Sequence, residues 1–204
     1  MAKKKVPFIV AGDIGYGNLK TAYGFSNEEP TVSVRPATAA KKDAVGKIDL
    51  GNTNQKHPGM FVNVDGATSI ACCAPSMIEG YVREKQHDYV STLHYKALYH
   101  ASLLELPVNV VDIYATGLPV MHFMDDAKEK ELRDFMIGEH QITATRTVTV
   151  KDVKIYPQPA GAFWKFINSK ATEEDLETIE DGFVCVADPG YFSWDWSKYV
   201  CGYL

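Results

Sequence analysis

Gly12-Asp-Ile-Gly-Tyr-Gly17 lies near the start of the chain, and a related stretch, Ala187-Asp-Pro-Gly-Tyr-Phe192, lies near its end. Each contains Asp-x-Gly-Tyr, follows an apolar run and precedes a second strand-like run. This pattern predicts two similar β-hairpins with glycine-containing turns. Internal repetition constrains a whole architecture, so the two hairpins set the frame for the rest of the chain.

The chemistry of the two turns suits a phosphate. Successive backbone N–H groups around a glycine form an anion-binding concavity, and two facing turns would hold a polyphosphate from both sides. Each turn also carries an aspartate, Asp13 or Asp188. A carboxylate repels a phosphate unless a cation lies between them, and Mg²⁺ does this with few protein ligands. The pair therefore indicates a magnesium–nucleotide site.

Between the turns, hydrophobic periodicity predicts alternating strands and helices. The residues from 38 to 60 are polar and predict irregular structure, and 61–71 predict a hairpin with Asp65-Gly66 as its turn. This order is typical of an α/β fold with a mixed sheet. We expect further strands at 6–11, 19–25, 31–34, 108–115, 142–156, 183–187 (buried) and 192–200, and helices over 87–104 and from 125, 159 and 172. The last of these helices would open with a capping box at Thr172-Glu-Glu-Asp175.

The three tryptophans, Trp164, Trp194 and Trp196, are expected in the core. Trp194 and Trp196 alternate along the last strand and therefore share one side of it. If nothing covers that side, it becomes an exposed apolar patch that favours self-association.

Composition excludes several classes of protein. The 204 residues carry 21 basic and 26 acidic side chains, a net charge of −5, which disfavours direct binding to nucleic acid. No apolar run reaches the length of a membrane span, so we expect no direct membrane contact and a cytoplasmic location. The four cysteines are adjacent or far apart in sequence, which supports neither a zinc knuckle nor a disulfide framework: Cys72, Cys73, Cys185 and Cys201.

With these motifs the sequence resembles the actin-like ATPase superfamily, and within it the plasmid-segregation actins of the ParM and StbA type. Residues Asp13 to Lys20 resemble the first phosphate motif, Asp188 to Asp195 the second, and Tyr156-Pro-Gln-Pro-Ala-Gly-Ala162 the first connecting motif. Ala115-Thr-Gly-Leu-Pro-Val120 is also typical of these proteins. The resemblance implies an actin-like, ribonuclease H-like fold, with a mixed five-stranded sheet flanked by helices and a C-terminal β-hairpin.

The resemblance also implies roles for single residues. Asp13 and Asp188 would be the catalytic carboxylates on the magnesium side, and Gln158 would orient the attacking water. Lys20 would reach the phosphates from the second strand. The remaining phosphate contacts would come from Gly15, Tyr16, Gly17 and Asn18 in the first turn and from Gly190 and Ser193 in the second. Each motif also has a plainer interpretation: a tight hairpin, a solvated lysine at position 20, or a helix-capping Gln158.

The resemblance divides the chain into an actin-like domain I at 1–181, with an inserted subdomain at about 38–86, and the first hairpin of a domain II at 182–204. The second motif departs from the family pattern, since its glycines are reduced to Gly190 and Pro189 lacks a backbone donor. Because the chain stops at Leu204, we expect a truncated gene product, a fragment, or a protein that hydrolyses ATP poorly.

The function implied is a nucleotide-dependent ATPase of plasmid or DNA segregation, using ATP (or GTP) with Mg²⁺. It would self-associate into a filament or dimer, with ATP binding favouring the polymer, and a DNA adaptor protein is a possible partner. One alternative is a ribonuclease H-like nuclease in which Asp13, Asp188 and Asp195 gather two metal ions. The other is a scaffold remnant without catalysis.

Overall fold

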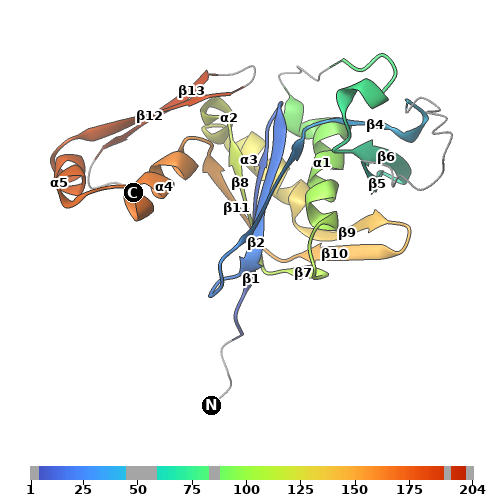
Figure 1. Cartoon of the computed structure of the whole chain (residues 1–204), viewed down its shortest axis with the longest axis horizontal. Coiled ribbons are helices and arrows are strands. Elements are labelled where there is room, and N and C mark those ends of the chain that lie inside the picture. The colour runs from blue at the N-terminus through green and yellow to red at the C-terminus, as the bar shows by residue number, and fades with distance from the viewer. Residues whose placement is uncertain (1–4, 45–58, 83–87, 191–193, 201–204) are drawn as a thin grey trace.

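The computed structural model describes residues 5–44, 59–82, 88–190 and 194–200. At its centre lies a five-stranded sheet of order β11-β8-β1-β2-β3 (Figure 1). β2 is antiparallel to β1 and β3, whereas β8 is parallel to β1 and β11, so the sheet is mixed, as the sequence predicts. These strands are β1 (Phe8–Ile14), β2 (Asn18–Phe25), β3 (Thr31–Pro36), β8 (Ile113–Leu118) and β11 (Val153–Pro157).

One face of this sheet holds the core. Alternate residues of its strands are buried, among them Val10 and Tyr114, and they pack with α1 (Leu93–Leu104) and α3 (Asp126–Met136). Leu98 of α1 and Leu132 of α3 are buried in the same cluster. Figure 1 shows the C-terminal hairpin and α4 on the other side of the sheet from α1. That other face therefore remains available for a site.

Two small sheets extend the core beyond α1. One has the order β4-β6-β5 and the other β7-β10-β9. The predicted hairpin at 61–71 is confirmed, with Asp65 and Gly66 both at positive φ (50° and 82°), as a tight hairpin turn requires. The strands are β4 (Ala39–Lys41), β5 (Met60–Val64), β6 (Ala67–Ala71), β7 (Val110–Val111), β9 (Gly138–Thr143) and β10 (Arg146–Val150).

The expectation of irregular structure from 38 to 60 is wrong at β4. Ala39 is buried and pairs with Ala71, so a tertiary contact overrides the polar local sequence. A short 3₁₀ turn, η1 (Lys42–Ala44), follows β4, and another, η2 (Pro75–Met77), follows β6. Residues 45–58 of the expectation lie outside the described residues.

The helix expected over 87–104 begins later, at Leu93. A 3₁₀ turn, η3 (Tyr89–Ser91), precedes it, and the Thr92 side chain accepts a hydrogen bond from the Tyr95 N–H and caps the helix. The predicted start of α3 at Asp125 is confirmed, and the Asp125 side chain caps the helix by accepting hydrogen bonds from the Ala127 and Lys128 N–H groups. The short α2 (Val120–Phe123) is not apparent from the sequence, because one turn carries no periodic signal.

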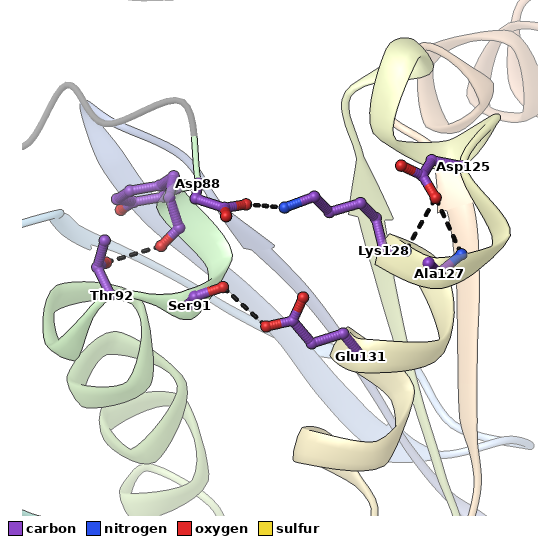
Figure 2. A network of polar contacts seen from close by, with 8 residues as sticks. Asp88, Ser91, Thr92, Asp125, Ala127, Lys128 and Glu131 are labelled. Atoms are coloured by element: carbon purple, nitrogen blue, oxygen red, sulfur yellow. Dashed lines mark hydrogen bonds and ion pairs between the residues drawn. The ribbon is translucent and has the colours of Figure 1, made fainter.

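Figure 2 shows how η3 is attached to α3. Lys128 pairs with Asp88, and Ser91 donates to the Glu131 carboxylate at 2.9 Å. Exposed pairs of this kind contribute little to stability, because water and salt screen them. Their effect is therefore mainly to orient η3, whose Tyr89 contacts the first hairpin.

The C-terminal part contains α4 (Ala160–Ser169), α5 (Glu173–Asp181), β12 (Phe183–Pro189) and β13 (Trp194–Val200). The predicted capping box between Thr172 and Asp175 is confirmed. The predicted burial of 183–187 is wrong, because β12 and β13 form a two-stranded sheet with one uncovered face. The core assignment of the tryptophans is wrong as well, since Trp164, Trp194 and Trp196 are 45%, 71% and 63% exposed.

In the described part of the chain, no helix has both the length and the apolar character that crossing a membrane requires.

Two buried histidines, His100 on α1 and His140 on β9, connect these elements to β5 and α3. His100 Nδ1 donates to the Asn63 carbonyl on β5, and His140 Nε2 donates to the Met136 carbonyl at the end of α3, at 2.9 Å. The two ring centroids are 5.5 Å apart. Burial lowers the pKa of both imidazoles, so both are neutral at pH 7. Lys96, Asp65 and Glu139 are the charged groups around the small cavity that the two rings line.

The histidine pair predicts a stability that falls in mild acid. The unfolded imidazoles titrate near pH 6.5 and the folded ones lower, so the unfolded state binds more protons in between. Their stabilisation is complete above about pH 6.5 and is lost as the pH falls toward the folded pKa values. Urea unfolding at pH 7.5, 6.5 and 5.5 should show this fall, and a flatter profile in the His100→Gln/His140→Gln variant. Equal slopes in both proteins would contradict it.

Candidate functional site

A cavity of about 710 Å³ lies between the open face of the sheet and the C-terminal elements. Sites for small molecules occupy about 300–1,000 Å³, so a nucleotide-sized ligand is within range. β1, β2, β8 and the β11–α4 junction form most of its wall, and β12 adds Asp188. The polar and charged side chains in the wall are Asp13, Lys20, Tyr156, Gln158 and Asp188, and the buried residues Thr21 and Thr116 also border the cavity.

Asp13 and Lys20 face each other across the first hairpin. They are directly paired in the antiparallel register of β1 and β2, and Lys20 Nζ donates to Asp13 Oδ2 at 2.8 Å. The hydrogen bond and the charge of Asp13 raise the pKa of Lys20, so the ammonium is held in its charged form. Both side chains are about half exposed, so this pair remains accessible from the cavity.

Asp188 reaches the same place from the other end of the chain. It lies on β12 opposite Asp195, and its carboxyl is close enough to Asp13 and Lys20 to feel both charges. Burial and the charge of Asp13 raise the pKa of Asp188, while Lys20 opposes the rise. The two Asp-x-Gly-Tyr segments, 175 residues apart in the sequence, therefore bring their carboxylates to one cavity.

Gln158 lies between β11 and α4, where the connecting motif turns. Its N–H donates to the Leu118 carbonyl at 2.8 Å, and its own carbonyl accepts from the Gly161 N–H. The backbone is thereby held at both sides, and the side chain lines the cavity. Pro159 is the N-cap residue of α4 and, among the described residues, no side chain caps the helix, so the Gln158 amide is not used for capping.

The tip of the first hairpin, Gly15 to Asn18, lies outside the cavity wall. The Gly15 N–H donates to the Asn18 carbonyl at 3.1 Å, which closes the turn. Tyr89 supports it from η3, since its hydroxyl donates to the Gly15 carbonyl at 3.3 Å and its ring packs on Tyr16 at 4.5 Å between centroids. Neither Gly15 nor Gly17 has a positive φ, so conformational freedom does not explain them. A Cβ at Gly15 would lie 3.3 Å from the Asn18 carbonyl oxygen, a tight contact.

The second turn is seen only in part. Gly190 is exposed and does not line the cavity, and Ser193 lies outside the described residues. Of the ten residues that the sequence singles out, the structure brings four to the cavity wall: Asp13, Lys20, Gln158 and Asp188.

The charges of these residues fit a magnesium nucleotide. Asp13 and Asp188 repel each other, and Lys20 is the cationic side chain in the part of the cavity wall that the structure describes, so a divalent cation there would relieve the repulsion. Magnesium bound with phosphates takes one or two carboxylates and keeps several waters. No group of three or more His, Cys, Asp or Glu in the described ranges could hold a metal by itself. The donor set therefore suits a cation shared with a ligand's phosphates.

Comparison with protein families then decides the class. Residues 11–161 match the family described as the N-terminal domain of actin-like proteins. The chain belongs to the actin-like protein family. The match covers the first hairpin from residue 11 onward, the buried histidine pair, and the connecting motif as far as Gly161. A search of curated proteins finds no match.

Solved structures of actin-like proteins share the fold. The apo psk41 ParM protein is 16% identical, with a TM-score of 0.62 over 97% of this chain and 67% of that one. The Alp12 filament structure is 14% identical, with a TM-score of 0.61 over 96% and 58%. Bacillus thuringiensis ParM with ATP is 12% identical, with a TM-score of 0.56 over 96% and 57%. This actin-like chain thus spans between 57% and 67% of the length of these three proteins.

The nuclease alternative gains no support from these comparisons, since the matching family and structures are actin-like. Asp195 points with Asp188 to the covered side of the hairpin but is absent from the cavity wall. Lys20, which a two-metal site would repel, instead pairs directly with Asp13.

Sequence reasoning missed part of the cavity wall. Thr116 and Gly117 line it from β8, and the exposed rings of Tyr156 and Trp164 line it from β11 and α4. The Thr-Gly pair after a β-branched strand was a usable signal, and its motif is typical of the family. Trp164 had no such signal, because a helical apolar stripe normally faces the core.

The mutual influence of the site charges can be measured. Asp13→Asn removes one negative charge and should lower the pKa of Asp188 toward its ordinary value, whereas Lys20→Met should raise it further. Carboxyl chemical shifts followed by NMR between pH 3 and 7 would report both shifts. Asp134→Asn, which removes an exposed carboxylate of α3 that does not line the cavity, is the matched control and should leave the pKa of Asp188 unchanged. Unchanged titration in all three variants would show that the turns do not meet.

Proposed function

We propose that this actin-like chain binds a nucleoside triphosphate with Mg²⁺ in the cavity between its two hairpins. The observation that carries the proposal is the meeting of Asp13, Lys20 and Asp188 from opposite ends of the chain. ATP is the favoured nucleotide, because a related structure holds ATP, and GTP is the competitor to be tested.

The residues of the chain divide the work by charge. When bound, magnesium supplies positive charge that offsets the phosphates. Asp13 and Asp188 would hold the hydrated cation from two sides, and the Lys20 ammonium would leave Asp13 for a phosphate oxygen. Transfer of a phosphoryl group to water depends on positioning and charge stabilisation rather than on a covalent step with the protein.

Gln158 would hold the attacking water by its side-chain amide, just before the N-terminus of α4. The Gln158 backbone is anchored at both the N–H and the carbonyl, so the amide is presented from a fixed position. Hydrolysis is therefore proposed as the activity of this site, with Gln158 placing the nucleophile.

The proposal extends to assembly. The Alp12 relative is described as a filament, and we propose that this chain also self-associates when it holds nucleotide. Plasmid or DNA segregation through an adaptor protein is the cellular role proposed for the filament. The acidic net charge favours contact with DNA through an adaptor rather than directly.

Metal-dependent nucleotide binding is the decisive test. Calorimetric titration with ATP and excess Mg²⁺ should show binding that Asp13→Ala weakens at least about tenfold, because a cation ligand is lost. In EDTA the same variant should bind ATP no more weakly than the parent protein, because the lost carboxylate would only have repelled the phosphates. GTP titrated in parallel reports nucleotide preference.

Asp134→Ala is again the matched control, since it removes an exposed carboxylate of α3 that does not line the cavity. It should leave binding unchanged. Cleavage of single-stranded DNA or RNA without affinity for ATP would overturn the proposal in favour of the nuclease, and silence in both assays would favour the scaffold.

A further inference from the structure

The end of β8, Thr116-Gly117-Leu118, occupies the centre of the site. β8 runs between β1 and β11 and is parallel to both. The carboxyl ends of parallel strands meet at one edge of a sheet, so this segment lies between the strand that carries Asp13 and the strand that leads to Gln158. It contacts both neighbours, and the proposed function gives it no role.

Toward β1, Thr116 holds the backbone in front of Asp13. Thr116 pairs with Gly12 in register, and its buried hydroxyl donates to the Gly12 carbonyl at 2.8 Å. Gly12 itself cannot carry a side chain, because a Cβ there would lie 2.1 Å from the Tyr114 hydroxyl oxygen. The peptide group between Gly12 and Asp13 is thus held by Thr116 and packed against Tyr114, both on β8.

Toward β11, Gly117 makes room for Gln158. A Cβ at Gly117 would lie 2.9 Å from the Gln158 Cγ and 3.3 Å from its Cα. The first contact is closer than side-chain carbons approach in proteins, so any larger residue displaces Gln158. The φ of Gly117 is not positive, so its requirement is space rather than backbone conformation.

We propose that Thr116 and Gly117 are positioning residues that set Asp13 and Gln158 relative to each other across β8. Gly117 fixes where the Gln158 side chain starts, and Thr116 fixes the peptide before Asp13. The catalytic consequence rests on the proposed function, whereas the packing of residue 117 against residue 158 does not. A displacement of about 1 Å at a site that positions a nucleophile lowers the rate by about 100-fold.

A double-mutant cycle tests the packing without any nucleotide. The melting temperatures of the parent protein, Gly117→Ala, Gln158→Ala and the double variant are compared by calorimetry. Gly117→Ala should lower the melting temperature, and the fall should be clearly smaller in the Gln158→Ala background, where Cγ is gone. Gly24→Ala is the matched strand control, since its Cβ meets nothing nearer than 3.6 Å, and it should not lower the melting temperature. Additive effects at 117 and 158 would overturn the proposal.

Steady-state ATP hydrolysis tests the positioning. Gly117→Ala should lower kcat about 10- to 100-fold and change the dissociation constant for Mg-ATP less than about threefold, since Gln158 acts on the water and not on binding. Thr116→Val should lower kcat, and Thr116→Ser, which keeps the hydroxyl, should restore most of it. Gly24→Ala should retain the parent kcat. Equal kcat in Gly117→Ala and Gly24→Ala would overturn the positioning role.

The two assays separate the two ideas. A parent protein that neither binds nor hydrolyses ATP refutes the proposed function, and the melting-temperature cycle then still decides whether residue 117 places residue 158. Coupling in the cycle together with full activity in Gly117→Ala refutes the positioning role while leaving the proposed function intact.

Discussion

The parallel pairing of β8 with β1 and β11 positions the groups that form the site. It sets three strand ends side by side at one edge of the sheet, with Asp13, Thr116 and Gln158 at or just beyond them. The pairing is tight, because the Tyr114 hydroxyl occupies the space that a Cβ at Gly12 would need. Residues some 145 positions apart therefore meet with little freedom.

Charge explains why this edge is suited to a ligand rather than to a closed core. Asp13 and Asp188 raise each other's energy when both are ionised, and one lysine is present to offset them. A protein without a ligand here keeps this repulsion, whereas a cation with its phosphates relieves it. The repulsion between the two carboxylates therefore favours binding of a cation, and charges perturbed in this way are common at functional sites.

Residues outside the cavity support the first hairpin through a series of contacts. The first hairpin tip does not line the cavity, yet Tyr89 contacts both Gly15 and Tyr16. Tyr89 belongs to η3, which polar contacts attach to α3 (Figure 2). α3 and α1 share the buried core with β1, so the tip of the first hairpin is held, through η3 and α3, by the packed face of the central sheet.

Local patterns predicted much of the secondary structure. Alternation in β2, the Asp65-Gly66 turn and the Asp125 and Thr172 caps all follow from interactions within a few residues. The start of α1 could not be predicted as well, because the residues before Leu93 form a 3₁₀ turn held by contacts with α3. Burial on the C-terminal hairpin failed for a similar reason: an apolar strand pattern does not say whether another layer covers it.

Neighbouring residues alone specify the two Asp-x-Gly-Tyr turns, the mixed α/β order and the connecting motif centred on Gln158. In contrast, the packing of the whole chain brings Asp13, Lys20, Gln158 and Asp188 to one cavity and requires a glycine at position 117. Those facts depend on which strands pair and how closely their side chains approach, and such distances are set by the packed fold and not by local preference.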